Sequence, residues 1–301
     1  MGKLQGVILF YVVLFVTTLA HAGKPSTLMY VANEDSNNVM VVNLDTEEKI
    51  VTIPTGEKPH ALVFAAGKAY VNNRGSEYLT VIEMDTVIDE YSAVETREIS
   101  LPAISFQLAL SPDGQTLAVS YKNALMVSLL DVESEEIETI QLGDTPADGF
   151  SETPMKHPHW SKDGSYLYAQ NNIDDYIAKI ELDSLDVVAK IAMPGSNHDL
   201  VASANDKILY AVNQNTDSGT SLTVIDTETD SIITDIIIPL AEDETGFGHH
   251  GSLSPNGKIF YFCNEGIKGG LGYRVTLIDT VNMEIIKPIE VGNGAGHAVF
   301  S

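Results

Sequence analysis

Histidine is the residue type in this chain with the most versatile chemistry. The 301 residues contain eight histidines, and one of them, His21, lies near the N-terminus. A neutral imidazole binds copper, zinc, iron or nickel, and it also serves as an acid or base near neutral pH. The other seven histidines are therefore the candidate metal ligands: His60, His157, His159, His198, His249, His250 and His297.

The positions of these histidines follow a recurring turn. Ser-Pro-Asp-Gly-like turns occur at residues 111–114, 161–164 and 254–257, with weaker copies at 64–67 and 203–206. Four histidines stand four residues before such a turn or its equivalent, and His198 stands five residues before one. The remaining copy carries Gln107 instead. His159 follows His157 by two residues, which predicts that both lie on the same strand face.

A strand-turn-strand unit recurs six times and indicates the fold class. Each copy has an aromatic-rich strand, a polar turn and an apolar strand closed by Asp, as in Tyr30–Asn33 followed by Val41–Asp45. The closing aspartates lie 40 to 53 residues apart, which is the period of a four-stranded propeller blade. Asp-Gly and Asn-Gly pairs supply the positive-φ positions of hairpins, and helical periodicity is absent. The sequence therefore predicts an all-β fold, a six-bladed β-propeller with four-stranded antiparallel blades.

The two ends of the chain bear on the number of blades. The first unit begins at its second strand, near Leu28, and lacks an inner strand. The C-terminal segment 296–301 has the pattern of an inner strand, so joining the ends would complete six blades and remove exposed sheet edges. Because Ser301 falls where another hairpin turn would begin, a truncated seven-bladed propeller is the alternative.

Inner strands line the central channel of a propeller, so repeated histidines at their starts predict a ring at one channel mouth. Such a ring would bind a metal ion, copper first and zinc second, or another small ligand. Two acidic connections, 143–156 and 241–248, lead into His157 and His249. Their carboxylates are candidate supplementary ligands: Asp148, Glu152, Asp243 and Glu244. The alternative is that each imidazole hydrogen-bonds a neighbouring backbone and that the loops are simply solvated.

Composition and the N-terminus indicate the compartment and exclude several partners. The apolar run Val7–Leu19 and the small residues at 20–22 predict a signal peptide over 1–22, a single propeller domain over 23–301, and a periplasmic or secreted protein. No later segment is long enough to insert into a membrane. A net charge of −25 without a basic cluster excludes nucleic acid as a partner.

Cysteine usage excludes two further types of site. The one cysteine, Cys263, has no partner for an intramolecular disulfide, and its apolar strand predicts a buried core residue. The absence of Cys-x-x-Cys-His excludes covalent haem, and the absence of Gly-x-Ser-x-Gly removes support for a nucleophilic serine.

The repeat units resemble the YVTN family of propeller repeats. Tyr30-Val31-Ala32-Asn33 is close to the family signature, and Thr223–Thr227 is similar to a typical partner strand. The resemblance covers essentially the whole chain after residue 22. It implies the propeller fold and says little about activity, because propellers carry many unrelated functions.

Two further resemblances are confined to one blade. The segment Lys156–Tyr168 is similar to the His-His-Pro-His segment of the copper-cluster propeller in nitrous-oxide reductase, which implies copper binding by His157 and His198. Lys156 stands in place of that family's first ligand, and no cupredoxin-like domain follows. The same segment is similar to the His-Pro-His segment of lactonase-type propellers, which implies substrate-binding or acid/base roles for His157 or His159.

Three functions therefore remain open. The first is an exported metal-binding propeller with copper at the channel mouth and a redox-accessory role. The second is a lactonase-type hydrolase that uses the same mouth. The third is a scaffold for a protein partner, in which the histidines are structural.

Overall fold

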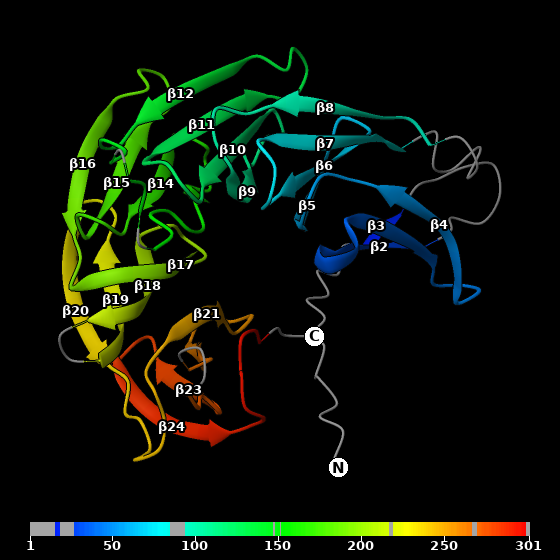
Figure 1. The fold of residues 1–301 in the computed structure, drawn as a ribbon. Coiled ribbons are helices and arrows are strands. Elements are labelled where there is room, and N and C mark those ends of the chain that lie inside the picture. The colour runs from blue at the N-terminus through cyan, green and yellow to red at the C-terminus, as the bar shows by residue number, and fades with distance from the viewer. Residues whose placement is uncertain are drawn as a thin grey trace. The chain divides into compact units, whose positions relative to one another are not determined.

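The computed structural model describes residues 16–18, 27–84, 94–146, 148–150, 152–216, 219–266 and 270–298. Within these residues the chain forms six four-stranded antiparallel sheets, and its helical structure includes the 3-10 turn η1 (Glu34–Ser36) (Figure 1). The all-β prediction is confirmed, and the number of sheets fits six propeller blades.

Two compact units make up the chain, and each is described by itself. The first comprises residues 1–108 and 132–135. Its two complete sheets have the strand orders β1-β2-β3-β4 and β5-β6-β7-β8. The strands are β1 (Val16–Thr18), β2 (Thr27–Asn33), β3 (Asn38–Asn43), β4 (Glu48–Pro54), β5 (Pro59–Ala65), β6 (Lys68–Asn73), β7 (Tyr78–Glu83) and β8 (Thr96–Ser100).

The second unit comprises residues 109–131 and 136–301, and strand β9 crosses the boundary between the units. The remaining four sheets are β9–β12, β13–β16, β17–β20 and β21–β24, each with its strands in sequential order. Their strands are β9 (Ser105–Leu110), β10 (Thr116–Tyr121), β11 (Met126–Asp131), β12 (Ile137–Gln141), β13 (His159–Trp160), β14 (Tyr166–Asn171), β15 (Tyr176–Glu181), β16 (Val187–Ala192), β17 (Gly195–Ala202), β18 (Ile208–Thr216), β19 (Gly219–Asp226), β20 (Ser231–Ile237), β21 (Gly248–Leu253), β22 (Ile259–Asn264), β23 (Arg274–Asp279) and β24 (Glu284–Glu290).

The recurring Ser-x-Asp-Gly turns join the first strand of a sheet to the second. In the turn between β13 and β14, the Ser161 hydroxyl donates to Asp163 Oδ1 at 2.7 Å and accepts the Tyr166 N–H at 2.9 Å. Gly164 takes a φ of +76°, which a residue with a Cβ adopts only with strain. The same bonds recur at Ser254, where Asn256 and Gly257 take the corresponding places. Local turn chemistry therefore sets the hairpin spacing that the sequence shows.

Apolar side chains fill the space between successive sheets. In the second unit, Tyr210 and Val212 of β18 pack with Phe260 and Phe262 of β22 in one buried cluster. The rings of Tyr210 and Phe260 lie 5.1 Å apart, centroid to centroid. A separate cluster joins the two sheets of the first unit. This face-to-face burial holds neighbouring sheets together and fixes the position of each opening strand.

The expectation for the first sheet is wrong in one respect. The place beside β2 is taken by β1, in which Val16 pairs with Met29 and Thr18 with Thr27. The C-terminal segment was expected there, but residues 296–298 are not in a strand, and 299–301 lie outside the described residues. Strand β1 lies within the predicted signal peptide, and most of that segment lies outside the described residues.

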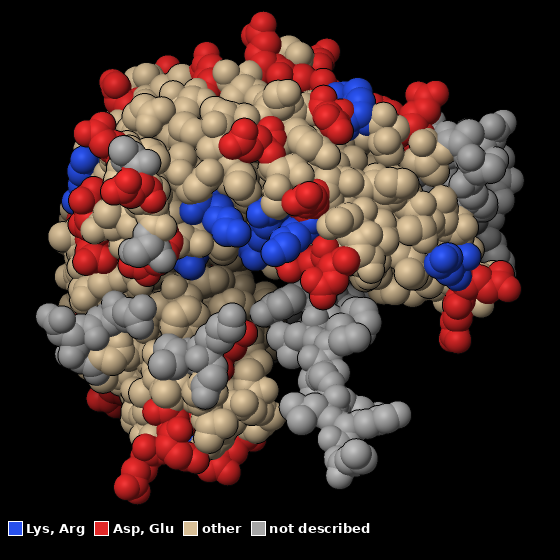
Figure 2. Space-filling view, in the orientation of Figure 1, with Lys and Arg blue, Asp and Glu red and all other residues tan. Residues whose placement is uncertain are grey.

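Acidic side chains are spread over the face of the molecule seen in Figure 2, and basic ones are far fewer, as the net charge of −25 requires. Among the described residues, no helix is long and apolar enough to cross a membrane.

Candidate functional site

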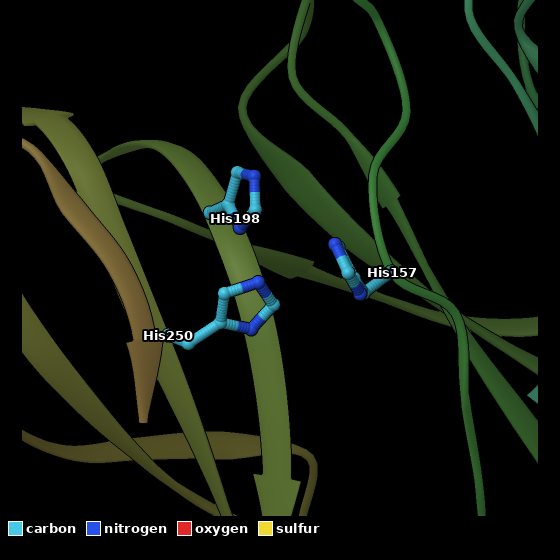
Figure 3. A group of neighbouring side chains, drawn as sticks. All are labelled: His157, His198 and His250. Carbon is cyan, nitrogen blue, oxygen red and sulfur yellow. The ribbon is translucent and has the colours of Figure 1, made fainter. Parts of the chain in front are cut away.

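Five of the seven candidate histidines meet in the second unit. Two groups of three offer nitrogen atoms that all lie within 4.8 Å of one another: His157, His198 and His250, and His249, His250 and His297. Figure 3 shows the three rings of the first group turned toward a common space. Their centroids lie 4.8 Å (His157 to His250), 4.9 Å (His157 to His198) and 5.0 Å (His198 to His250) apart.

The second group continues directly from the first. The rings of His250 and His297 stack at 3.9 Å with an interplanar angle of 25°. His249 lies 4.5 Å from His250 and 4.2 Å from His198, centroid to centroid. The five imidazoles therefore form one continuous cluster, and His250 is the residue that both groups share.

Two opening strands, β17 and β21, carry three of these side chains, and a β-bulge marks the position in each strand. His157 and His297 lie in segments outside the strands. In β17 the register shifts between Asn197 and Asp199, so His198 is the extra residue. In β21 it shifts between Gly248 and Gly251, across the two histidines. A bulge interrupts the alternation of strand faces and re-aims side chains. Adjacent residues can therefore both reach the cluster.

The glycines on either side of His249 and His250 allow β21 to lie close to its neighbours. A Cβ at Gly248 would stand 2.5 Å from Phe262 Cζ, and one at Gly251 would stand 2.2 Å from Phe260 Cζ. Neither distance is compatible with a real side chain. The motif Gly-His-His-Gly thus brings the backbone against the aromatic core and fixes the backbone positions from which the two imidazoles project.

Burial keeps two of the imidazoles neutral. It lowers the pKa of His198 well below its ordinary value, and the neighbouring rings of His157 and His249 lower it further. Burial, followed by the charge of His250, lowers the pKa of His249 to about 3. At neutral pH both therefore present a nitrogen lone pair, which is the form that binds metal ions.

Asp199 and Glu265 are two carboxylates that sequence reasoning missed. Asp199 Oδ2 accepts from His250 Nδ1 at 3.0 Å and from the Gly251 N–H at 3.2 Å. Burial would raise the pKa of Asp199, but the hydrogen bond and charge of His250 outweigh it and lower the pKa to about 2. Glu265 Oε2 lies 3.2 Å from His249 Nε2. Asp199 directly follows His198 in sequence, but its partner is 51 residues away, and no sequence signal joins them.

Two candidate histidines belong to neither group. His60 lies in the first unit, at a bulge of β5, and its Nδ1 pairs with Glu34. His159 opens β13 opposite Tyr168, and burial lowers the pKa of its imidazole. The prediction that His157 and His159 share a strand face is wrong, because His157 precedes the strand.

The expected loop carboxylates do not join the described histidine groups. Glu244 is buried and structural, accepting from the backbone N–H groups of Ala241 and Tyr273 and pairing with Arg274 at 3.4 Å. Asp243 accepts from the Tyr273 hydroxyl at 2.8 Å. Asp148 and Glu152 are exposed. Cys263 is fully buried, as predicted, and burial raises the pKa of its thiol to about 12.

Comparison with known proteins identifies the fold of this chain but not its family or function. No protein-family model matches the sequence, and no curated protein matches it. Hydrazine synthase of Kuenenia stuttgartiensis is similar in structure, with a TM-score of 0.64 and 17% identity over 89% of this chain and 84% of that one. The dihydro-heme d1 dehydrogenase NirN, solved in complex with DHE, has a TM-score of 0.66 and 14% identity over 88% of this chain and 55% of its own.

A third similar structure is a functionally unknown protein from Desulfotomaculum acetoxidans DSM 771. It has a TM-score of 0.65 and 11% identity over 88% of this chain and 80% of that one. Identities this low show a shared fold alone. Together with the six four-stranded sheets, they identify the chain as a six-bladed β-propeller.

Proposed function

We propose that this chain is an exported β-propeller that binds a transition-metal ion, copper first, through the clustered histidines at the channel mouth. The observation that carries the proposal is the meeting of five imidazoles from strands β17 and β21 and from two segments outside the strands, with His250 common to both groups. Neutral rings at His198 and His249 are ready to donate a lone pair. The YVTN repeat resemblance is part of the same proposal.

The donor set and its spacing fit such an ion. Imidazole suits copper and zinc, and metal–nitrogen bonds of roughly 2.0–2.1 Å in a tetrahedral site place ligand nitrogens about 3.4 Å apart. The nitrogens of each group lie within 4.8 Å of one another, so small ring rotations are enough to close the site. Copper is the first candidate ion because the predicted signal peptide places the protein outside the cytoplasm. Because copper is redox-active, the proposal includes a redox-accessory role.

Export has a consequence for the first sheet. Cleavage after Ala22 would remove β1, leaving β2, β3 and β4 in that sheet. We expect mass spectrometry of protein expressed with its full leader and recovered from the periplasm to give Gly23 as the first residue. Recovery of the intact chain from the membrane fraction would contradict export as a soluble protein.

Metal analysis of protein purified without a His tag tests the function. The wild-type chain, stripped with chelator and then given Cu²⁺, is expected to retain one equivalent after gel filtration. The double variant His157→Ala/His250→Ala removes a ligand from each group and is expected to retain none. His60→Ala is the matched control, because His60 pairs with Glu34 in the other unit, and it should bind copper like the wild type.

The outcomes separate the three functions. Copper retained equally by the double variant and the wild type would overturn the proposed site. A metal-free wild-type protein that opens lactones would indicate the hydrolase instead. A wild-type protein with neither property would leave the interaction scaffold.

A further inference from the structure

His250 stands in both histidine groups, and the contact at its second nitrogen limits what it can do. Its Nδ1 lies 3.0 Å from Asp199 Oδ2, and the same oxygen also accepts the Gly251 N–H. A carboxylate accepts hydrogen bonds and does not donate them, so Nδ1 carries the proton. Only Nε2 then has a lone pair for a metal ion. His250 can ligate one ion at a time, and the two groups are alternative positions for that ion.

The two positions differ in exposure. The first group consists of His157, the buried His198 and His250, and we call it the inner position. The second consists of His249, His250 and the exposed His297, and we call it the outer position. The outer position also has the carboxylate of Glu265 beside His249, at 3.2 Å. An ion arriving from solvent therefore meets His297 and this negative charge first.

We propose that the outer position captures the ion and passes it to the inner position, with His250 bound throughout. This inference rests on the proposed metal-binding function. The transfer is a ligand exchange without change of oxidation state: bonds from the ion to His249 and His297 break, and bonds to His157 and His198 form. The rings are close enough for it, because His198 lies 4.2 Å from His249 and 5.0 Å from His250, centroid to centroid. Water completes the coordination at each stage.

The order of the two positions predicts opposite kinetic effects for two single variants. His297→Ala removes a ligand of the outer position alone, so Cu²⁺ uptake and release should both slow at least tenfold while Kd changes by less than threefold. His157→Ala removes a ligand of the inner position alone. Its uptake should stay at the wild-type rate, while its release accelerates and Kd rises at least tenfold.

Stopped-flow mixing of Cu²⁺ with the full metal-free chain, together with equilibrium titration, measures both quantities. His157→Asn serves as a second inner variant in case the alanine disturbs folding, and circular dichroism checks every variant. Binding of two equivalents with similar affinity by the wild type would overturn the shared-ligand argument. Equal effects of the His297 and His157 variants on rate and affinity would overturn the transfer order alone. A wild type that binds no copper would overturn the proposed function as well.

Discussion

Substitution of Gly251 by alanine tests how close packing of β21 positions the histidines. A Cβ at this residue would stand 2.2 Å from Cζ and 2.5 Å from Cε1 of Phe260, and 3.1 Å from Val212 Cγ2. Ordinary van der Waals contact begins near 3.4 Å, so the strand or the ring must move by more than 1 Å. Phe260 is fully buried in the cluster between two sheets and has little room to move.

The expected cost follows from overpacking a dense core. Inserting one methyl group into such a site lowers the free energy of unfolding by about 1–3 kcal/mol. Because Gly251 directly follows His250, movement of β21 also displaces the shared imidazole and its bond to Asp199. We therefore expect Gly251→Ala to weaken Cu²⁺ binding at least tenfold in addition to lowering stability.

Urea unfolding and copper titration of four variants measure these effects. Gly292→Ala is the matched control, because a Cβ there meets no atom within 4 Å, and its stability should change by less than about 0.5 kcal/mol. Phe260→Leu is made alone and in the Gly251→Ala background, where it frees space beside the new methyl group. The double-mutant cycle should show a favourable coupling of about 1 kcal/mol or more. An unfolding free energy of Gly251→Ala equal to that of the wild type, or a cycle without coupling, would refute the packing argument.

Three further predictions concern single side chains. Asp199→Asn should weaken Cu²⁺ binding by about 10–100-fold, measured by titration, because the amide no longer fixes the proton on His250 Nδ1; an unchanged Kd would contradict the positioning role. Cys263 should resist iodoacetamide at pH 8 in the folded protein and react in urea, since its thiol is buried with a pKa raised to about 12; rapid labelling of folded protein would contradict its place in the core. The hydrogen bond and charge of His60 lower the pKa of Glu34. The free energy of unfolding that this pair contributes is therefore fully present above pH 4.5, and it is lost as the pH falls through the lowered pKa. Glu34→Gln should therefore cost about 0.2–1 kcal/mol at pH 6 and less at pH 2, as urea unfolding at both pH values would measure.

The sequence by itself determined the all-β class and the blade-sized repeat. Both depend on local chemistry: a hydroxyl and a carboxylate two residues on, as at Ser161 and Asp163, close a turn wherever they occur. Apolar strands that recur at a blade-sized period then favour stacked four-stranded sheets. The sequence also marked the histidine positions, because the strand segments before these turns are equivalent from sheet to sheet. The prediction that the C-terminal segment lies beside β2 in the first sheet is wrong, since a free sheet edge does not specify which segment pairs with it.

Only the tertiary structure decided which histidines act together. His60 and His198 stand at similar bulges, but His60 meets Glu34 whereas His198 meets three other imidazoles. The difference arises from the neighbouring sheet, which no spacing along one strand reveals. The same reason hides Asp199 among 42 acidic residues. Its carboxylate is ionised and bound to His250 because the packing of β17 against β21 brings the two side chains within 3.0 Å of each other.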